Sequence, residues 1–332
     1  GDYEFDDLAN ITQNEALTGL SDFSWRGLYD AALSGNSGPM KRPVSMGSFA
    51  LNAATTGLSQ PLYFKLTNLL VHLVNGILVY WLIGLVLRRL YEAKGKLADQ
   101  RTLQWVQCST TAIWLLHPLN LTSVLYIVQR MTSLAAGFTF LATGLYILGR
   151  QRLLQESGRN GWSLILCGVL GAGTLAILSK ETGALVPPLL LVIEITLFKF
   201  ACAEERDKRW LTIIFLVAVL LPLLLFMWAT ATNSPYLYGG YVSRDFDMTE
   251  RVLTQARVLW FYLQLICVPS LTSLGLYHDD FVMSRALLAP PQTLVAIVGL
   301  GFLLAIAVAS IRKLPVLAFG VFWFFTGHLI ES

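Results

Sequence analysis

The stretch Leu62–Leu87 reads LYFKLTNLLVHLVNGILVYWLIGLVL and contains one charged residue, Lys65, near its start. A helix crosses the hydrocarbon core of a bilayer with about 20 mainly apolar residues, so this stretch is long enough to span a membrane. The whole chain of 332 residues has 55% hydrophobic and only 14% charged residues. Because a soluble domain needs about 25% charged residues to wet its surface, this composition predicts an all-α polytopic membrane protein.

Eight apolar stretches are expected to cross the membrane, with short polar links or longer loops between them. They are Leu62–Leu87, Leu103–Leu121, Met131–Leu148, Trp162–Leu178, Ala184–Phe198, Trp210–Ala229, Gln292–Ile311 and Pro315–Ile330. A ninth apolar stretch, Val258–Val268, is too short to span and is expected to be an interfacial or re-entrant helix.

The sidedness follows from the basic residues. Four links carry more than twice as many Lys and Arg as Asp and Glu: Arg88–Arg101, Gly149–Gly161, Lys199–Arg209 and Arg312–Lys313. Alternate threading puts all four on one side, and the positive-inside rule makes that side the cytoplasm. A crossing by Val258–Val268 would break this agreement.

The expected organisation has four segments, and we expect the chain to continue at both ends in a longer protein. The segments are an outer loop at 1–61, a six-span core at 62–229, an outer loop with the interfacial helix at 230–291, and two further spans at 292–332.

Ionisable residues collect on the expected outer side, close to the membrane boundary. Charge is costly at membrane depth, so such residues are candidates for function. The candidates are Asp6, Asp7, Arg42, His72, His117, Arg130, Lys180, Glu181, His278, Asp279 and Asp280. Each also has a structural interpretation, since loop charges are usually solvated and a histidine such as His72 is more often a packing residue. The triplet at 278–280 is a weak signal for a metal site, and a divalent metal is left open.

Several short motifs occur together and in order along the chain. They are Phe5-Asp6-Asp7 with Ile11 and Asn14, Lys41-Arg42-Pro43-Val44, Asn68 with His72 and Asn75, His117-Pro118 with Gln129-Arg130, Ser179-Lys180-Glu181-Thr182-Gly183, the stretch 251–258, His278-Asp279-Asp280, and the closing 327–332. This series resembles the transmembrane-and-TPR O-mannosyltransferases and their bacterial relatives.

The resemblance implies a GT-C glycosyltransferase, a helical membrane bundle with large outer loops. Such enzymes transfer a sugar from a polyprenyl-phosphate or dolichyl-phosphate carrier to a hydroxyl acceptor, here expected to be a protein Ser or Thr. In that family the acidic pair of the first loop is catalytic. The resemblance also implies a multi-pass protein of the bacterial inner membrane with its site on the outer face; the alternative is the ER membrane.

The chemistry of the reaction gives the candidates their expected roles. A hydroxyl is a poor nucleophile, so Asp6 is expected to accept its proton, with Asp7 as the orienting or charge-tuning neighbour. The alternative is that the two aspartates exchange these roles. The departing lipid phosphate needs cations, for which Arg130, Lys180 and His117 are the candidates. A single displacement would invert the anomeric centre.

Two other functional classes remain open. A transporter or flippase of lipid-linked sugars would share the lipid groove but need no base, and a non-catalytic membrane scaffold would tolerate loss of Asp6. The net charge of +3 is too small to argue for a nucleic-acid partner.

The topology is testable by labelling with a membrane-impermeant thiol reagent. In a background without the native cysteines, a Cys at Ser37 should be labelled from outside, and a Cys at Lys96 should react only after permeabilisation. The reverse pattern would refute the sidedness.

Overall fold

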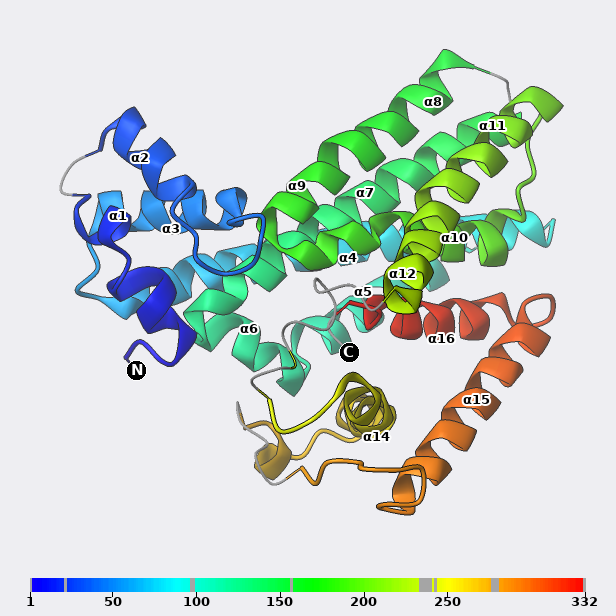
Figure 1. Cartoon of the computed structure of the whole chain (residues 1–332). Helices are drawn as coiled ribbons and strands as arrows, with labels where there is room; N and C mark the ends of the chain where they lie inside the picture. The colour runs from blue at the N-terminus through cyan, green and yellow to red at the C-terminus, as the bar shows by residue number, and fades with distance from the viewer. Residues whose placement is uncertain are drawn as a thin grey trace. The chain divides into compact units, whose positions relative to one another are not determined.

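The computed structural model describes residues 2–20, 23–95, 99–155, 158–232, 241, 244–275 and 281–330. Over these ranges the chain is built of helices joined by turns, and it contains no β-strand (Figure 1). This confirms the all-α fold class.

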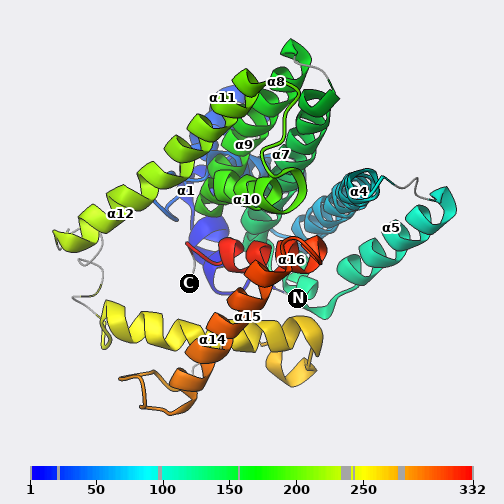
Figure 2. The ribbon, with the colours of Figure 1, turned by 90° about the vertical axis from the view of Figure 1, so that its right-hand side faces the viewer.

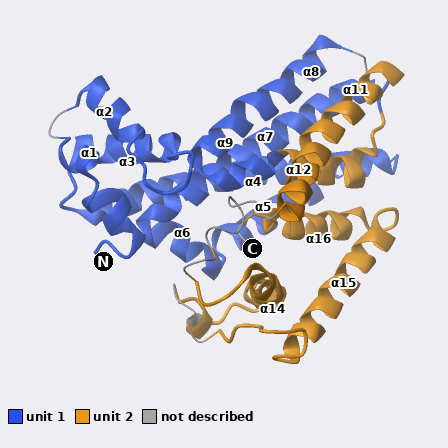
Figure 3. Cartoon of the chain, in the orientation of Figure 1, with its two compact units in different colours: residues 1–186, 202–204 blue, residues 187–201, 205–332 orange. Residues whose placement is uncertain are grey.

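The chain divides into two compact units (Figure 3). The first unit is 1–186 with 202–204, and the second is 187–201 with 205–332. These units group residues by their contacts, whereas the four segments expected from the sequence are defined by membrane side. The four-segment organisation therefore stays a prediction.

The first unit holds the N-terminal helices and most of the candidate residues. Its helices are α1 (Glu15–Thr18), α2 (Trp25–Ala32), α3 (Pro43–Thr56), α4 (Pro61–Ala93), α5 (Gln100–Leu115), α6 (Leu121–Leu125), α7 (Arg130–Gln155), α8 (Arg159–Leu166) and α9 (Gly173–Ser179). The second unit contains most of α10 (Val186–Ile193), followed by α11 (Glu205–Phe215), α12 (Leu221–Ala231), α14 (Met248–Cys267), α15 (Gln292–Ser310) and α16 (Pro315–Gly327).

Six continuous helical stretches in the described residues are long and apolar enough to cross a membrane. They are Pro61–Ala93, Ile127–Gln155, Arg159–Ser179, Glu181–Phe198, Glu205–Ala231 and Gln292–Ser310. Each overlaps one of the stretches expected from the sequence, and together they make the chain a multi-pass membrane protein.

The other two expected spans lie on shorter helices. α5 has 16 residues and α16 has 13, so at 1.5 Å per residue they measure about 24 and 20 Å, below the ~30 Å hydrocarbon core. α5 ends where His117 precedes Pro118, because a residue before proline is disfavoured in the helical conformation. The crossing of these two segments, and the sidedness that depends on it, stay predictions.

The helix over Val258–Val268 is longer than the sequence analysis expected. α14 begins at Met248 because Asp247 and Glu250 cap it reciprocally, with N–H to carboxylate distances of 2.8 and 3.0 Å. It lies against α15 (Figure 2), where the Trp260 indole donates to the carbonyl of Ala296 at 2.9 Å. α14 is not among the six span candidates; its interfacial placement stays a prediction.

Polar side chains on one face of α4 form hydrogen bonds with neighbouring segments of the first unit. Asn68 donates to the carbonyl of Ile127 at 3.2 Å, and Asn75 donates to that of Ser133 at 2.7 Å. His72 Nε2 lies 3.0 Å from the carbonyl oxygen of Leu115 on α5. Backbone carbonyls can only accept, so each of these contacts uses a side-chain N–H. His72 thus joins α4 to α5, which fits its interpretation as a packing residue, and its site role stays a prediction.

Arg130, at the start of α7, is fully buried and hydrogen-bonded on every nitrogen. Its Nε donates to the Asn68 amide oxygen at 2.7 Å, and Nη2 donates to the Phe64 carbonyl at 2.8 Å. Nη1 donates to the Asn52 amide oxygen at 2.6 Å and to the Ser48 carbonyl at 3.2 Å. One guanidinium thus joins α3, α4 and α7.

Replacing Arg130 with Ala should lower stability by several kcal/mol, because each buried acceptor left without a donor costs about 1–3 kcal/mol. Thermal unfolding of the detergent-solubilised protein measures this effect. Arg209→Ala, at an exposed arginine of α11, is the control and should leave the midpoint nearly unchanged. Equal midpoints for the two variants would contradict the structural role of Arg130.

Candidate functional site

The two adjacent aspartates of the first loop have opposite environments. Asp7 is 1% exposed, and its carboxylate accepts the backbone N–H of Val128 at 2.7 Å and that of Glu4 at 3.2 Å. Asp6 is exposed, and its backbone N–H donates to the Tyr126 hydroxyl at 3.1 Å. Consecutive side chains of a helical turn point in different directions, so one acid can be anchored while its neighbour faces solvent.

The burial of Asp7 affects its protonation. Burial raises the pKa of the Asp7 carboxyl, and the backbone N–H groups of Glu4 and Val128 offset part of that rise. Burial, assisted by the Asp7 charge, also raises the pKa of the neighbouring Tyr3 to about 12. Asp7 is therefore held in place by the backbone, in an environment that disfavours its ionised form.

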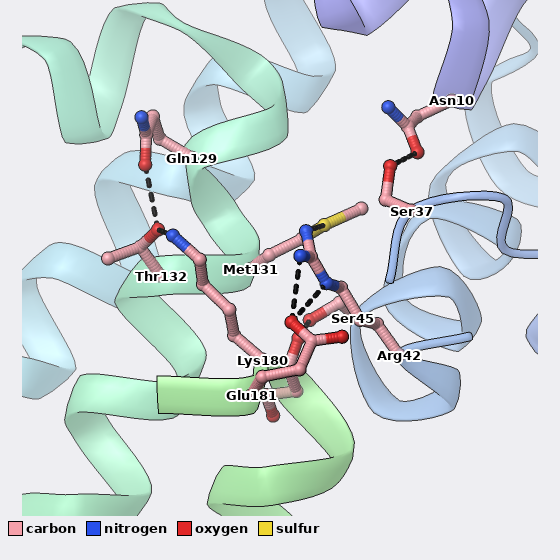
Figure 4. A network of polar contacts seen from close by, with 10 residues as sticks. Asn10, Ser37, Arg42, Ser45, Gln129, Met131, Thr132, Lys180 and Glu181 are labelled. Atoms are coloured by element: carbon pink, nitrogen blue, oxygen red, sulfur yellow. Dashed lines mark hydrogen bonds and ion pairs between the residues drawn. The ribbon is translucent and has the colours of Figure 1, made fainter. Parts of the chain in front are cut away.

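Two groups from the end of α9 contact segments distant in sequence (Figure 4). Lys180 Nζ donates to the Thr132 hydroxyl at 3.0 Å, and that hydroxyl donates to Gln129 Oε1 at 2.7 Å. The next residue, Glu181, forms an ion pair with Arg42, with Nη2 to Oε2 at 2.7 Å. The α9 end thereby contacts both the start of α7 and the segment that precedes α3.

The acidic turn is also linked to the segment that precedes α3. Asn10 donates to the backbone carbonyl of Asp6 at 2.8 Å. It also accepts from the Ser37 hydroxyl at 2.6 Å, as Figure 4 shows. A few residues later, the Ser45 hydroxyl donates to the carbonyl of Ser179 at 2.8 Å. The acidic turn and the end of α9 are thus both tied to the residues around the start of α3.

Of the eight predicted site residues that the structure describes, it brings five into one part of the first unit. The acidic pair lies on the Tyr126–Val128 segment, which leads into α7, while Lys180 and the Arg42–Glu181 pair contact the first turn of α7. Sequence reasoning missed Tyr126, Asn10, Ser37 and Thr132. The spacing of Asn10, four residues after Asp6 in a helical turn, was the one signal that could have found any of them.

Three of the predicted residues have other surroundings. The expectation that Arg130 contacts a phosphate directly does not fit its geometry, because its guanidinium is 0% exposed and engaged by α3 and α4. His72 packs between α4 and α5, stacked on Trp114. His117 caps the short turn Pro118–Asn120, where its Nδ1 accepts the Leu119 N–H at 3.3 Å.

His278, Asp279 and Asp280 lie outside the described residues. Among the residues that the structure does describe, no three His, Cys, Asp or Glu side chains are grouped so that they could hold a metal ion.

Comparison with known proteins finds distant relatives of this chain. Protein O-mannosyl-transferase TMTC4 from Homo sapiens is 28% identical over 223 residues, covering 63% of this chain and 28% of that protein. TMTC4 from Mus musculus is 27% identical, covering 59% and 27%, and Protein O-mannosyl-transferase TMTC1 from Mus musculus is 30% identical, covering 57% and 18%. The chain resembles the TMTC O-mannosyl-transferases. It spans less than a third of the length of these relatives. No family model and no solved structure matches it.

The environment of Asp7 gives a pH dependence with a definite sign. Its pKa is raised from 3.8 in the folded state, so the folded state binds this proton more tightly than the unfolded state. Stability contributed by this proton is present at low pH and is lost as pH rises from about 4 through the raised pKa.

As pH rises from 4 to 7, the unfolding midpoint of the wild type should therefore fall relative to that of Asp7→Asn. Because both proteins share all other carboxylates, the difference isolates this group. A constant difference, or one that grows in favour of the wild type, would contradict the assignment.

Proposed function

We propose that this chain carries the transfer site of a membrane glycosyltransferase that moves a sugar from a polyprenyl-phosphate carrier to a hydroxyl acceptor. The observation that carries the proposal is the acidic pair. An exposed carboxylate, Asp6, stands on a turn that Asp7 and Tyr126 hold to the start of α7. Similarity to protein O-mannosyl-transferases supports mannose as the sugar and a protein Ser or Thr as the acceptor.

In the proposed reaction Asp6 acts as the general base. The acceptor hydroxyl attacks the anomeric carbon, the bond from that carbon to the phosphate oxygen breaks, and the hydroxyl proton passes to the Asp6 carboxylate. The lipid phosphate leaves with its negative charge and needs no proton, so one catalytic carboxylate is sufficient. A single displacement of this kind inverts the configuration at the anomeric carbon.

Asp7 acts in this proposal as a positioning residue. Its two backbone hydrogen bonds and its burial leave it no face for a substrate, but they fix the turn that carries Asp6. Preorganisation matters because reacting atoms must be held about 3–3.5 Å apart for efficient transfer. A loose loop would not hold the Asp6 carboxylate at a constant place.

The cations that stabilise the leaving phosphate come from the first unit as well. Lys180 is half-buried at the end of α9, with its ammonium group on Thr132 beside the first turn of α7. His117 remains a further proposed donor. We place this chemistry on the non-cytoplasmic face of the membrane, which the basic links support. The bacterial inner membrane is the proposed location, with the ER membrane as the alternative.

The proposal is tested by Asp6→Asn in the purified full chain, with a synthetic polyprenyl-phosphate mannose donor and an acceptor peptide rich in Ser and Thr. Loss of a general base costs about 10²- to 10⁴-fold in rate, so turnover should fall at least a hundredfold. Donor binding should stay within about twofold of the wild type, because the base does not contact the phosphate.

Glu15→Gln is the matched control, since Glu15 is another exposed acid of the first loop and should keep full activity. If Asp6→Asn retains near wild-type transfer, the proposed mechanism is wrong. Donor flipping or complex assembly that persists in the variant would then favour a transporter or a scaffold.

A further inference from the structure

We propose that Arg42, held in place by Glu181, is the guanidinium that binds the phosphate of the lipid-linked donor. This inference rests on the proposed function and names the anion-binding residue of that same site. Arg130 was the sequence-based candidate for this role, but its guanidinium is 0% exposed and engaged by α3 and α4. Arg42 keeps 18% of its side chain exposed and directly precedes α3 as its N-cap residue.

The hydrogen bonds of Arg42 leave one edge of its guanidinium for a ligand. Nε and Nη2 both donate to the same oxygen, Glu181 Oε2, at 2.9 and 2.7 Å. That uses the edge formed by Nε and Nη2. The edge formed by Nη1 and Nη2 points elsewhere, and its one contact within the described residues is from Nη1 to the Met131 sulfur at 3.3 Å.

A thioether is a weak acceptor, so the contact with Met131 satisfies the Arg42 donor poorly. A phosphate offers several oxygens and binds the paired N–H groups of a guanidinium edge bidentately, with bonds about twice as strong as neutral ones. Phosphate oxygens would therefore displace the sulfur as the acceptor of Nη1 and engage the second N–H of Nη2.

Glu181 is placed so that it can orient Arg42. Its second oxygen, Oε1, is buried and has no hydrogen-bond partner in the described part of the chain. Gly38 packs directly against that oxygen, so closely that a methyl group at Gly38 would overlap it. Gly38 also has φ +76°, a conformation that favours glycine.

The backbone at Arg42 is held in an uncommon conformation. Lys41 and Arg42 are both left-handed, with φ of 58° and 50°, which costs roughly 1–2 kcal/mol for each non-glycine residue. Such strain persists only where surrounding contacts impose it, and it is frequent at ligand-binding sites. Here the ion pair with Glu181 supplies the contact. The Arg42 guanidinium contacts Met131, the neighbour of the Thr132 that Lys180 contacts.

The test measures binding of undecaprenyl phosphate and, separately, of inorganic phosphate to the full chain in nanodiscs. Arg42→Gln should weaken both by about tenfold to a hundredfold, as expected for loss of charge-assisted hydrogen bonds. Arg42→Lys keeps the charge but lacks the paired N–H groups needed for bidentate binding, and should still weaken binding about tenfold. Arg285→Gln is the matched control, because Arg285 forms a similar ion pair with Glu250 at 2.9 Å, and it should bind like the wild type.

Glu181→Gln tests the positioning role. It should reduce kcat in the wild-type background and have little further effect on an Arg42→Gln background, because Glu181 acts through Arg42. A merely structural Glu181 would instead give additive effects. The unfolding midpoint of each variant identifies any that misfolds, and Arg42→Lys then decides the binding question.

Equal binding by the wild type and both Arg42 variants would overturn the inference, whatever Asp6→Asn shows. A fall in inorganic phosphate binding alone would overturn the assignment to a lipid-linked donor. Weaker binding in the Arg42 variants together with active Asp6→Asn would leave the phosphate site standing and reject the proposed catalytic role of Asp6.

Discussion

The burial of the Arg130 guanidinium is the constraint on which the first unit depends. A buried charge without an ion pair in the described residues is tolerated only because amide and carbonyl oxygens of α3 and α4 accept its N–H groups, and because it lies 4.7 Å from the centre of the Phe49 ring. These contacts fix the start of α7. The residues just before that point anchor the acidic turn, and those just after it receive Arg42 and Lys180.

Near Arg130, polar residues that are adjacent in sequence have different environments and contact different segments. Asp7 is held by backbone N–H groups in an environment that raises its pKa, while Asp6 faces solvent one residue away. Lys180 reaches the first turn of α7, while Glu181 reaches the start of α3. In each pair one member extends away from the other, because neighbouring residues on a helical turn or at a helix end point in different directions. This division suits a site that needs both fixed and accessible groups.

The sequence predicted those features that depend on neighbouring residues alone, such as hydropathy and the position of charges. Hydropathy found the six long spans, and charge cost singled out Arg130, Lys180 and the acidic pair. It misjudged lengths where end effects decide, since Pro118 shortens α5 and the Asp247–Glu250 cap extends α14. It could not separate Arg130 from Arg42, because the difference is made by partners 62 to 139 positions away in sequence.

The central claim is that segments far apart in the chain form one site for a lipid-phosphate sugar. Photo-crosslinking tests it most directly, with a polyprenyl-phosphate sugar that carries a diazirine on the sugar ring. After digestion and mass spectrometry, the account predicts cross-links in the segments 2–20 and 179–186, both strongly reduced in Arg42→Gln. Cross-links confined to the second unit, or unchanged by Arg42→Gln, would contradict it.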